Sequence, residues 1–156
     1  GFTKVHNLLL KTEVQLTSLE KDILSAIYWL GKAAIDYLNS DKLVKIVVSI
    51  DLLLSQGRNN KKETIAKRYS SIVFAKESNE FILYIYNKIQ EYYIMRNEIL
   101  HAGRKYIDEE TPSSAELYAK LLVATLLKYV ESYQSISALI EKEFSIRNDV
   151  FSTNCK

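Results

Sequence analysis

Glycine and proline are scarce in this chain, which has 4 Gly and 1 Pro among its 156 residues. The tight turns of β-sandwiches and β-barrels depend on these two residues, so a fold built from many short strands has little support here. Apolar residues instead recur at steps of three and four, the spacing that gives a helix one apolar face. The sequence therefore predicts an all-α fold.

The pattern predicts an up-and-down bundle of about five helices. Gly103 indicates a helix end, because glycine accepts the left-handed conformation that follows many helices. Thr111-Pro112 indicates a helix start, with Thr as the cap and Pro at the first position. β-branched residues are frequent in 44–50 and 72–74, which leaves short strands there as an alternative. The expected helices cover 16–38, capped by Thr17 or Ser18, and then 41–55, 61–75, 79–101 and 113–131, with a continuation to about 144.

We expect one domain over residues 1–156, with an ordered core over about 16–145 and a loose tail over 146–156. The segment 41–55 is apolar nearly all round, which predicts that it forms the buried centre. The chain starts Gly-Phe-Thr rather than with Met. We therefore expect either a processed chain or a piece of a longer protein, which leaves room for a further domain or a regulatory partner.

Charge and cysteine content exclude several classes of protein. The net charge of +2 is too small to indicate nucleic-acid binding by itself. The single cysteine, Cys155, excludes an internal disulfide framework and a cysteine-based metal site, and it fits a reducing, cytoplasmic setting. No uncharged apolar run reaches the ~18 residues of a membrane helix, and neither a P-loop nor zinc-ligand spacing is present.

Two charged residues stand on apolar helix faces. On a helical wheel at about 100° per residue, Arg96 falls inside the stripe formed by Ile85, Ile89 and Tyr92. Asp51 lies among isoleucine and leucine in the segment SIDLLL. A charge on such a face is costly unless it is paired, which predicts a partly buried ion pair between Asp51 and Arg96. An ion pair with a purely structural role is the alternative.

His101 ends the same helix, five residues after Arg96. In a straight helix these two side chains diverge by about 140°. We therefore expect the last turn before Gly103 to unwind and bring the imidazole towards the arginine. Together the two groups can hold a phosphate and move a proton. The alternative is a histidine that only interacts with the negative end of the helix dipole.

The segment RNEILH, residues 96–101, resembles the Rx4-6H motif of the HEPN superfamily, with Asn97 as the polar residue that commonly follows the arginine. The wider pattern is similar to that of the Apea-like HEPN group. It consists of an apolar helix with an acidic residue, here Asp51, then a basic helical segment, then the motif from Tyr93 to Gly103. The resemblance covers roughly residues 19–130. It departs from the group at Asp51, where Glu is usual, and after His101, where Gly often follows directly.

This resemblance implies a HEPN-like fold and a metal-independent endoribonuclease that needs no cofactor. It also implies a homodimer in which two motifs face one cleft. His101 acts as base on the ribose 2′-OH or as acid to the leaving oxygen. Arg96 holds the scissile phosphate, Asn97 positions one of these groups, and Asp51 is a supporting acidic partner. A role as a toxin or an antiviral defence effector follows from the resemblance alone. Two alternatives stay open, namely a non-catalytic helical dimerisation or partner-binding module and an RNA-binding domain without cleavage.

Basic residues before and after the motif helix are candidates for contact with the RNA backbone. Plain solvation of a connector and a helix start is the alternative. Tyrosines also gather around the motif, and packing in a core or an interface explains them better than stacking on bases. The basic candidates are Arg58, Lys61, Lys62, Lys67, Arg68, Arg104 and Lys105. The tyrosines are Tyr84, Tyr86, Tyr92, Tyr93 and Tyr106.

Overall fold

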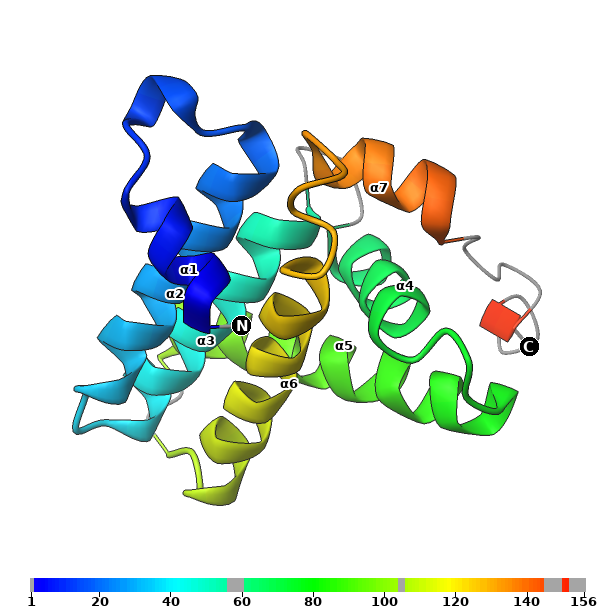
Figure 1. Cartoon of the computed structure of the whole chain (residues 1–156). Helices are drawn as coiled ribbons and strands as arrows, with labels where there is room; N and C mark the ends of the chain where they lie inside the picture. Colours follow the sequence, from blue (N-terminus) through cyan, green and yellow to red (C-terminus); the bar gives the residue numbers. More distant parts are fainter. Residues whose placement is uncertain (1, 56–60, 104–105, 145–149, 152–156) are drawn as a thin grey trace.

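The computed structural model describes residues 2–55, 61–103, 106–144 and 150–151 (Figure 1). Every regular element in those ranges is helical, which confirms the all-α prediction. The β-branched segments 44–50 and 72–73 lie in helices rather than strands. The elements are α1 (Phe2–Leu9), η1 (Glu13–Gln15), α2 (Ser18–Ala34), α3 (Asn39–Leu54), α4 (Lys61–Val73), α5 (Asn79–Ala102), α6 (Glu110–Leu126) and α7 (Ile136–Glu143), where η1 is a single 3₁₀ turn.

Side-chain caps explain where several helices begin. Thr17 is the N-cap of α2 and forms a reciprocal capping box with Glu20. The start of α6 differs from the prediction, because the helix begins at Glu110 and Thr111 lies inside it. The carboxylate of Asp108 accepts the Thr111 N–H at 2.7 Å and so takes the capping role. Pro112 is tolerated in this first turn because the N–H groups there have no partner within the helix.

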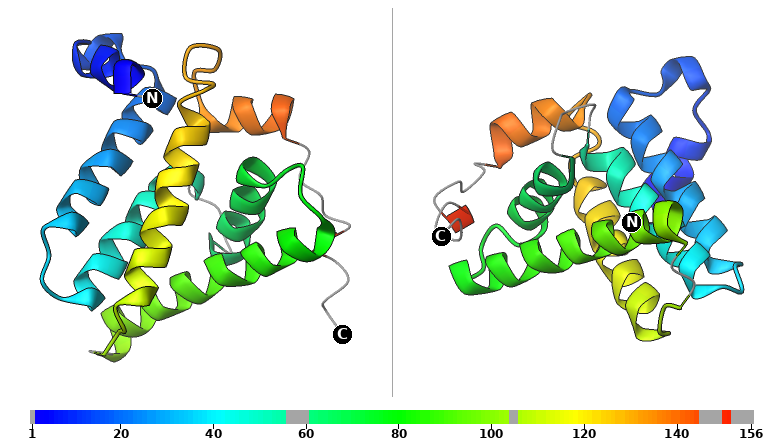
Figure 2. Two further views of the ribbon diagram at one scale, coloured as in Figure 1. Left: turned by 60° about the horizontal axis from the view of Figure 1, so that its bottom comes forward. Right: turned by 180° about the vertical axis from the view of Figure 1, so that it is seen from behind.

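Helix α3 is the centre of the core, as its composition predicts. It packs against α2, α4, α5 and α6. Leu43, Ile46 and Leu53 on its inner face are almost completely buried. Figure 2 (left) shows α2, α3 and α6 side by side and roughly aligned, while α5 runs obliquely across them. Helix α2 runs opposite to α3, but α6 begins beside the start of α3 and runs in the same direction. The up-and-down order is therefore seen for the pair α2 and α3, and α5 and α6 depart from it.

The two ends of the chain contribute packing that the sequence pattern did not predict. Leu8 of α1 is buried in the main core, and Lys4 lies 3.5 Å from Glu131 beyond α6. Val150 and Phe151 pack with Ile82 of α5 in a second, small apolar cluster. The expectation of a loose tail is wrong for these two residues, because Phe151 buries its ring against α5. Residues 145–149 and 152–156 lie outside the described part of the chain.

No helix in the described part of the chain is both long enough and apolar enough to cross a bilayer.

Candidate functional site on helix α5

Helix α5 carries the motif and is regular to its end. Ser78 caps its first turn by accepting the Phe81 N–H, and the helix continues through Ala102. Gly103 then adopts φ 68°, and its N–H bonds to the Glu98 carbonyl. The expected unwinding of the last turn is therefore wrong. The left-handed glycine ends the helix after His101, so the backbone around the histidine stays helical.

The guanidinium of Arg96 is held by neighbours on its own helix. Its Nη1 donates to Asn97 Oδ1 at 2.9 Å, and its Cζ lies 5.7 Å from the centre of the Tyr93 ring. The side chain is half-buried, and its Nε is fully buried without a hydrogen-bond partner. Arg96 thus makes two local contacts, and its buried Nε–H has no hydrogen-bond acceptor among the described residues.

Asp51 on α3 does not form the predicted ion pair with Arg96. No oxygen of Asp51 lies within 4 Å of a nitrogen of Arg96, and Asp51 Oδ1 is buried without a hydrogen-bond partner. Both charges nevertheless act on Tyr93. Burial raises the pKa of the Tyr93 phenol, the charge of Asp51 raises it further, and the charge of Arg96 opposes the increase. The ion pair is absent because the guanidinium turns along its own helix towards Asn97 and Tyr93.

His101 is exposed on the last turn of α5. Because the helix is regular, its side chain diverges from that of Arg96 by about 140°. Asn97 precedes His101 by four residues, so these two side chains are neighbours on one helix face. Asn97 therefore lies between the other two residues, bonded to Arg96 on one side and adjacent to His101 on the other. The arrangement is a short row of polar groups and not a converging pair.

The surface around this row is apolar and open. Ile94 and Leu100 on α5 are 42% and 50% exposed. A polar cavity of about 490 Å³ lies between the α2–α3 turn and the start of α6, and an apolar groove of about 420 Å³ lies between α2 and α6. None of the candidate catalytic residues lines either hollow. The motif therefore lies on an open helix surface.

The basic candidates that the structure describes all lie on α4 and differ in exposure. Lys61 is exposed, and Lys62 and Lys67 are half-buried, all on α4. The ammonium of Lys67 lies over the Phe151 ring at 5.8 Å. Arg68 is only 3% exposed, and its Nη1 donates to the carbonyl of Leu54 at the end of α3. Its assignment as an RNA contact is therefore wrong, because the side chain faces the core. Arg58, Arg104 and Lys105 lie outside the described residues.

The tyrosines divide between core and surface. Tyr92 is buried and donates to Ser114 on α6 at 2.9 Å, and Tyr86 lies against Phe151. Tyr84 and Tyr106 are exposed, at 52% and 82%. Packing explains the first two, as expected. The sequence pattern did not assign a role to the contact between Tyr93 and Arg96, although their spacing of three residues on one helix could have indicated it.

No protein-family model, curated protein or solved structure matches this chain. Within the described ranges, no group of three or more His, Cys, Asp or Glu side chains is arranged to hold a metal ion. The resemblance to HEPN domains therefore rests on the sequence motif alone.

Proposed function

We propose that this chain is a HEPN-like endoribonuclease that works as a homodimer without a metal ion. The observation that carries the proposal is the row of Arg96, Asn97 and His101 on the open end of α5. The Arg96 side chain is half-buried rather than enclosed, which leaves its guanidinium within reach of a phosphate, and His101 is exposed, so its imidazole can exchange a proton with the substrate. A guanidinium is well suited to phosphate, and a histidine exchanges protons near neutral pH.

The reaction needs a base, an acid and a cation at one phosphate. One His101 imidazole removes the proton from the ribose 2′-OH, and the 2′ oxygen attacks the adjacent phosphorus. The bond from phosphorus to the 5′ oxygen breaks, and a second imidazolium gives that oxygen its proton. The products are a 2′,3′-cyclic phosphate and a 5′-hydroxyl. Arg96 neutralises the charge that develops on the phosphoryl oxygens.

A second copy of the chain supplies what one copy lacks. One chain offers one His101, and its imidazole diverges from Arg96 along a regular helix. A twofold axis near the end of α5 would bring two such rows together, and the exposed Ile94 and Leu100 would be covered. A toxin or antiviral defence setting belongs to the same proposal and rests on the resemblance alone. A cytoplasmic location also belongs to it and rests on the single cysteine.

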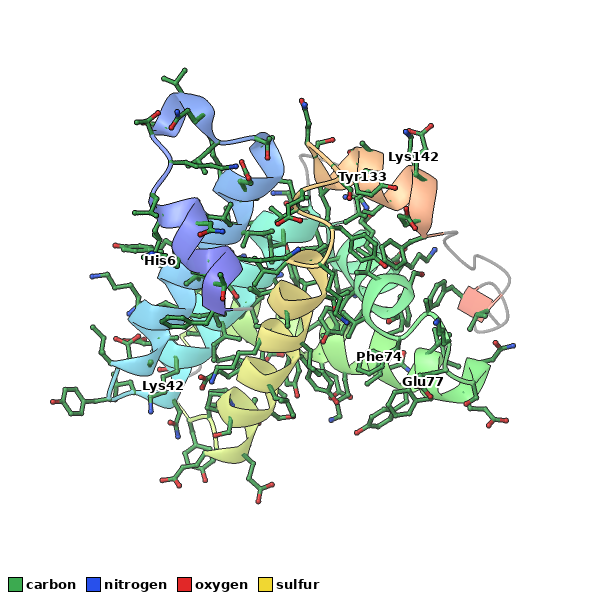
Figure 3. The ribbon with its side chains drawn as sticks, viewed as in Figure 1. His6, Lys42, Phe74, Glu77, Tyr133 and Lys142 are labelled. Carbon is green, nitrogen blue, oxygen red and sulfur yellow. The ribbon has the colours of Figure 1, made fainter. Side chains whose placement is uncertain are left out.

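The direct test is RNA cleavage in EDTA by the wild type and by His101→Ala. We expect wild-type cleavage with cyclic phosphate ends and a loss of about 10²- to 10⁴-fold in the variant, the usual contribution of acid–base catalysis. His6→Ala is the matched control, because His6 is the other histidine, is exposed and lies on α1 (Figure 3). Equal cleavage by folded wild-type and His101→Ala protein would exclude this mechanism.

Mixing the wild type with His101→Ala tests the shared site. The mechanism needs the His101 of both chains, so a mixed dimer, which keeps one His101, should be inactive. With random exchange of equal amounts, one quarter of the dimers keep both His101 side chains, which predicts about one quarter of the activity of the same total amount of wild type. About one half of that activity would mean that each chain acts by itself and would contradict the shared site.

The second candidate function is a non-catalytic module that dimerises or binds RNA or a protein partner. The exposed apolar residues beside the motif, Ile94 and Leu100, favour it, since such residues often form interfaces. It predicts a dimer, or bound RNA, with no cleavage under any condition. Sedimentation of the wild type and of Leu100→Lys, together with the cleavage assay, separates the two functions.

A further inference from the structure

Tyr93 lies one helical turn before Arg96 and offers the face of its ring to the guanidinium. The distance from Arg96 Cζ to the ring centre is 5.7 Å, within the range of a cation–π contact. The ring also packs against the main core, so its position is fixed by apolar contacts. A fixed ring on one side and the Asn97 amide oxygen on the other leave the guanidinium little freedom.

An alternative position for the guanidinium lies close by. Asp51 Oδ1 is buried and has no hydrogen-bond partner, and a buried carboxylate oxygen in that state favours any cation that reaches it. The charges of Asp51 and Arg96 both shift the pKa of the Tyr93 phenol, so both groups lie near this side chain. An Arg96 bound to Asp51 would have less charge and fewer donors available for a phosphate.

We propose that Tyr93 is a positioning residue that holds the Arg96 guanidinium away from Asp51 and keeps it available to an anionic phosphate. This inference rests on the proposed function for its biological meaning, since the phosphate is that of the RNA substrate. The aromatic ring holds the guanidinium in place, and the hydroxyl is not needed for this, because the cation–π contact is made by the face of the ring. Loss of the ring lets Arg96 move to Asp51, and phosphate binding weakens.

Two variants separate the ring from the hydroxyl, and a third reveals the competing position. Tyr93→Phe keeps the ring, and Tyr93→Leu removes it. The double variant Tyr93→Leu/Asp51→Asn removes the ring and also the charge that would capture Arg96. A side chain that only fills space would not be rescued by a change at Asp51, so recovery in the double variant identifies positioning.

The first readout does not need cleavage. Inorganic phosphate is titrated into the protein, and the Nε–Hε signal of the Arg96 side chain is followed by NMR. We expect the wild type and Tyr93→Phe to respond at the same phosphate concentration. Tyr93→Leu should need about 3- to 30-fold more, the range of a partly desolvated cation–π contact. The double variant should return to within about 3-fold of the wild type.

The second readout is RNA cleavage by the same four proteins, with kcat and KM measured separately. We expect a lower kcat/KM in Tyr93→Leu and recovery in the double variant. If the wild type binds phosphate as described and cleaves no RNA, the proposed function fails and the positioning role stands. Any one of three results would overturn the inference. These are equal phosphate affinity in the wild type and Tyr93→Leu, no recovery in the double variant, and an Arg96 signal that does not change when phosphate is added. If Tyr93→Leu does not fold, Tyr93→Met carries the same comparison.

Discussion

Arg68 provides a test in which the sequence pattern and the structure predict opposite results. By its position in a basic segment it is an RNA contact, but in the structure its side chain is buried between α3 and α4 and is 3% exposed. Its Nη1 donates to the Leu54 carbonyl, one of the last in α3, which has no partner within that helix. The positive charge of Arg68 at this helix end also interacts favourably with the negative end of the helix dipole. We therefore expect Arg68→Ala to lower stability and to leave RNA affinity unchanged.

The expected loss is about 2–4 kcal/mol. A hydrogen bond from a charged donor contributes about 1.5–3 kcal/mol, and the two buried methylenes lost on truncation contribute about 0.8 kcal/mol each. Release of a buried cation from its desolvation penalty offsets part of this sum. For a chain of this length, the loss corresponds to a fall in Tm of about 5–15 °C. Arg68→Met keeps the apolar stem, so it should lose less than Arg68→Ala.

Thermal unfolding followed by circular dichroism measures the stability of each variant. RNA affinity is measured by fluorescence anisotropy in a His101→Ala background, at a temperature where every variant is folded. Lys61→Ala is the matched control, because Lys61 is an exposed cation on the same helix. It should melt with the wild type. An Arg68→Ala protein that melts within about 2 °C of the wild type and binds RNA more weakly would refute this interpretation.

Three further predictions concern single side chains. Asp51→Asn should keep the free energy of unfolding within about 0.5 kcal/mol of the wild-type value or raise it, because no ion pair is lost. A decrease of more than about 2 kcal/mol, measured by urea unfolding, would contradict this. Gly103→Ala should cost about 1 kcal/mol through its φ of 68° alone, since no atom lies within 4 Å of the added carbon, and Gly103→Asn should cost less. Burial raises the pKa of Glu20, but hydrogen bonds from Lys11 and from Thr17, with the charge of Lys11, outweigh it and hold the pKa below its usual range. Its stabilising effect is therefore fully present above the unfolded-state pKa of about 4.3 and is lost as the pH falls through the lower folded-state pKa. Glu20→Gln should thus cost about 1 kcal/mol at neutral pH, and this cost should shrink in urea unfolding as the pH is lowered below about 4.

Helix positions were predictable where one face of a helix repeats over several turns. The apolar pattern located α2 to α6 to within a few residues, and α3 proved central because it is apolar on nearly every side. Helix α1 was missed because its 8 residues offer too few turns to show a period. The docking of Phe151 was missed for a different reason, since its partner Ile82 lies far away in the sequence. Contacts of that kind leave no local pattern.

In the candidate site, too, contacts between residues close in the sequence were predictable and contacts between distant residues were not. The hydrogen bond from Arg96 to Asn97 joins adjacent residues, and the Tyr93 contact joins residues three apart, so both follow from helix geometry. The pairing of Arg96 with Asp51 required knowledge of how α3 and α5 pack. Burial of Arg68 also depends on that packing. A charge on an apolar stripe indicates that something compensates it, but the stripe does not identify the partner.

The spacing of the motif gives a reason for a second copy that is independent of family resemblance. Side chains three, four or seven residues apart share a helix face, but five residues separate Arg96 from His101 and turn them about 140° apart. Because Gly103 keeps α5 regular to its end, no local change in backbone corrects this. A twofold axis across α5 reverses the order of the groups in the second copy. The Arg96 of one chain can then approach the partner subunit's His101, which the same-chain geometry does not allow. In the proposed dimer, the Arg96 and His101 side chains of one chain point in different directions, and this allows the scissile phosphate to contact groups from both chains.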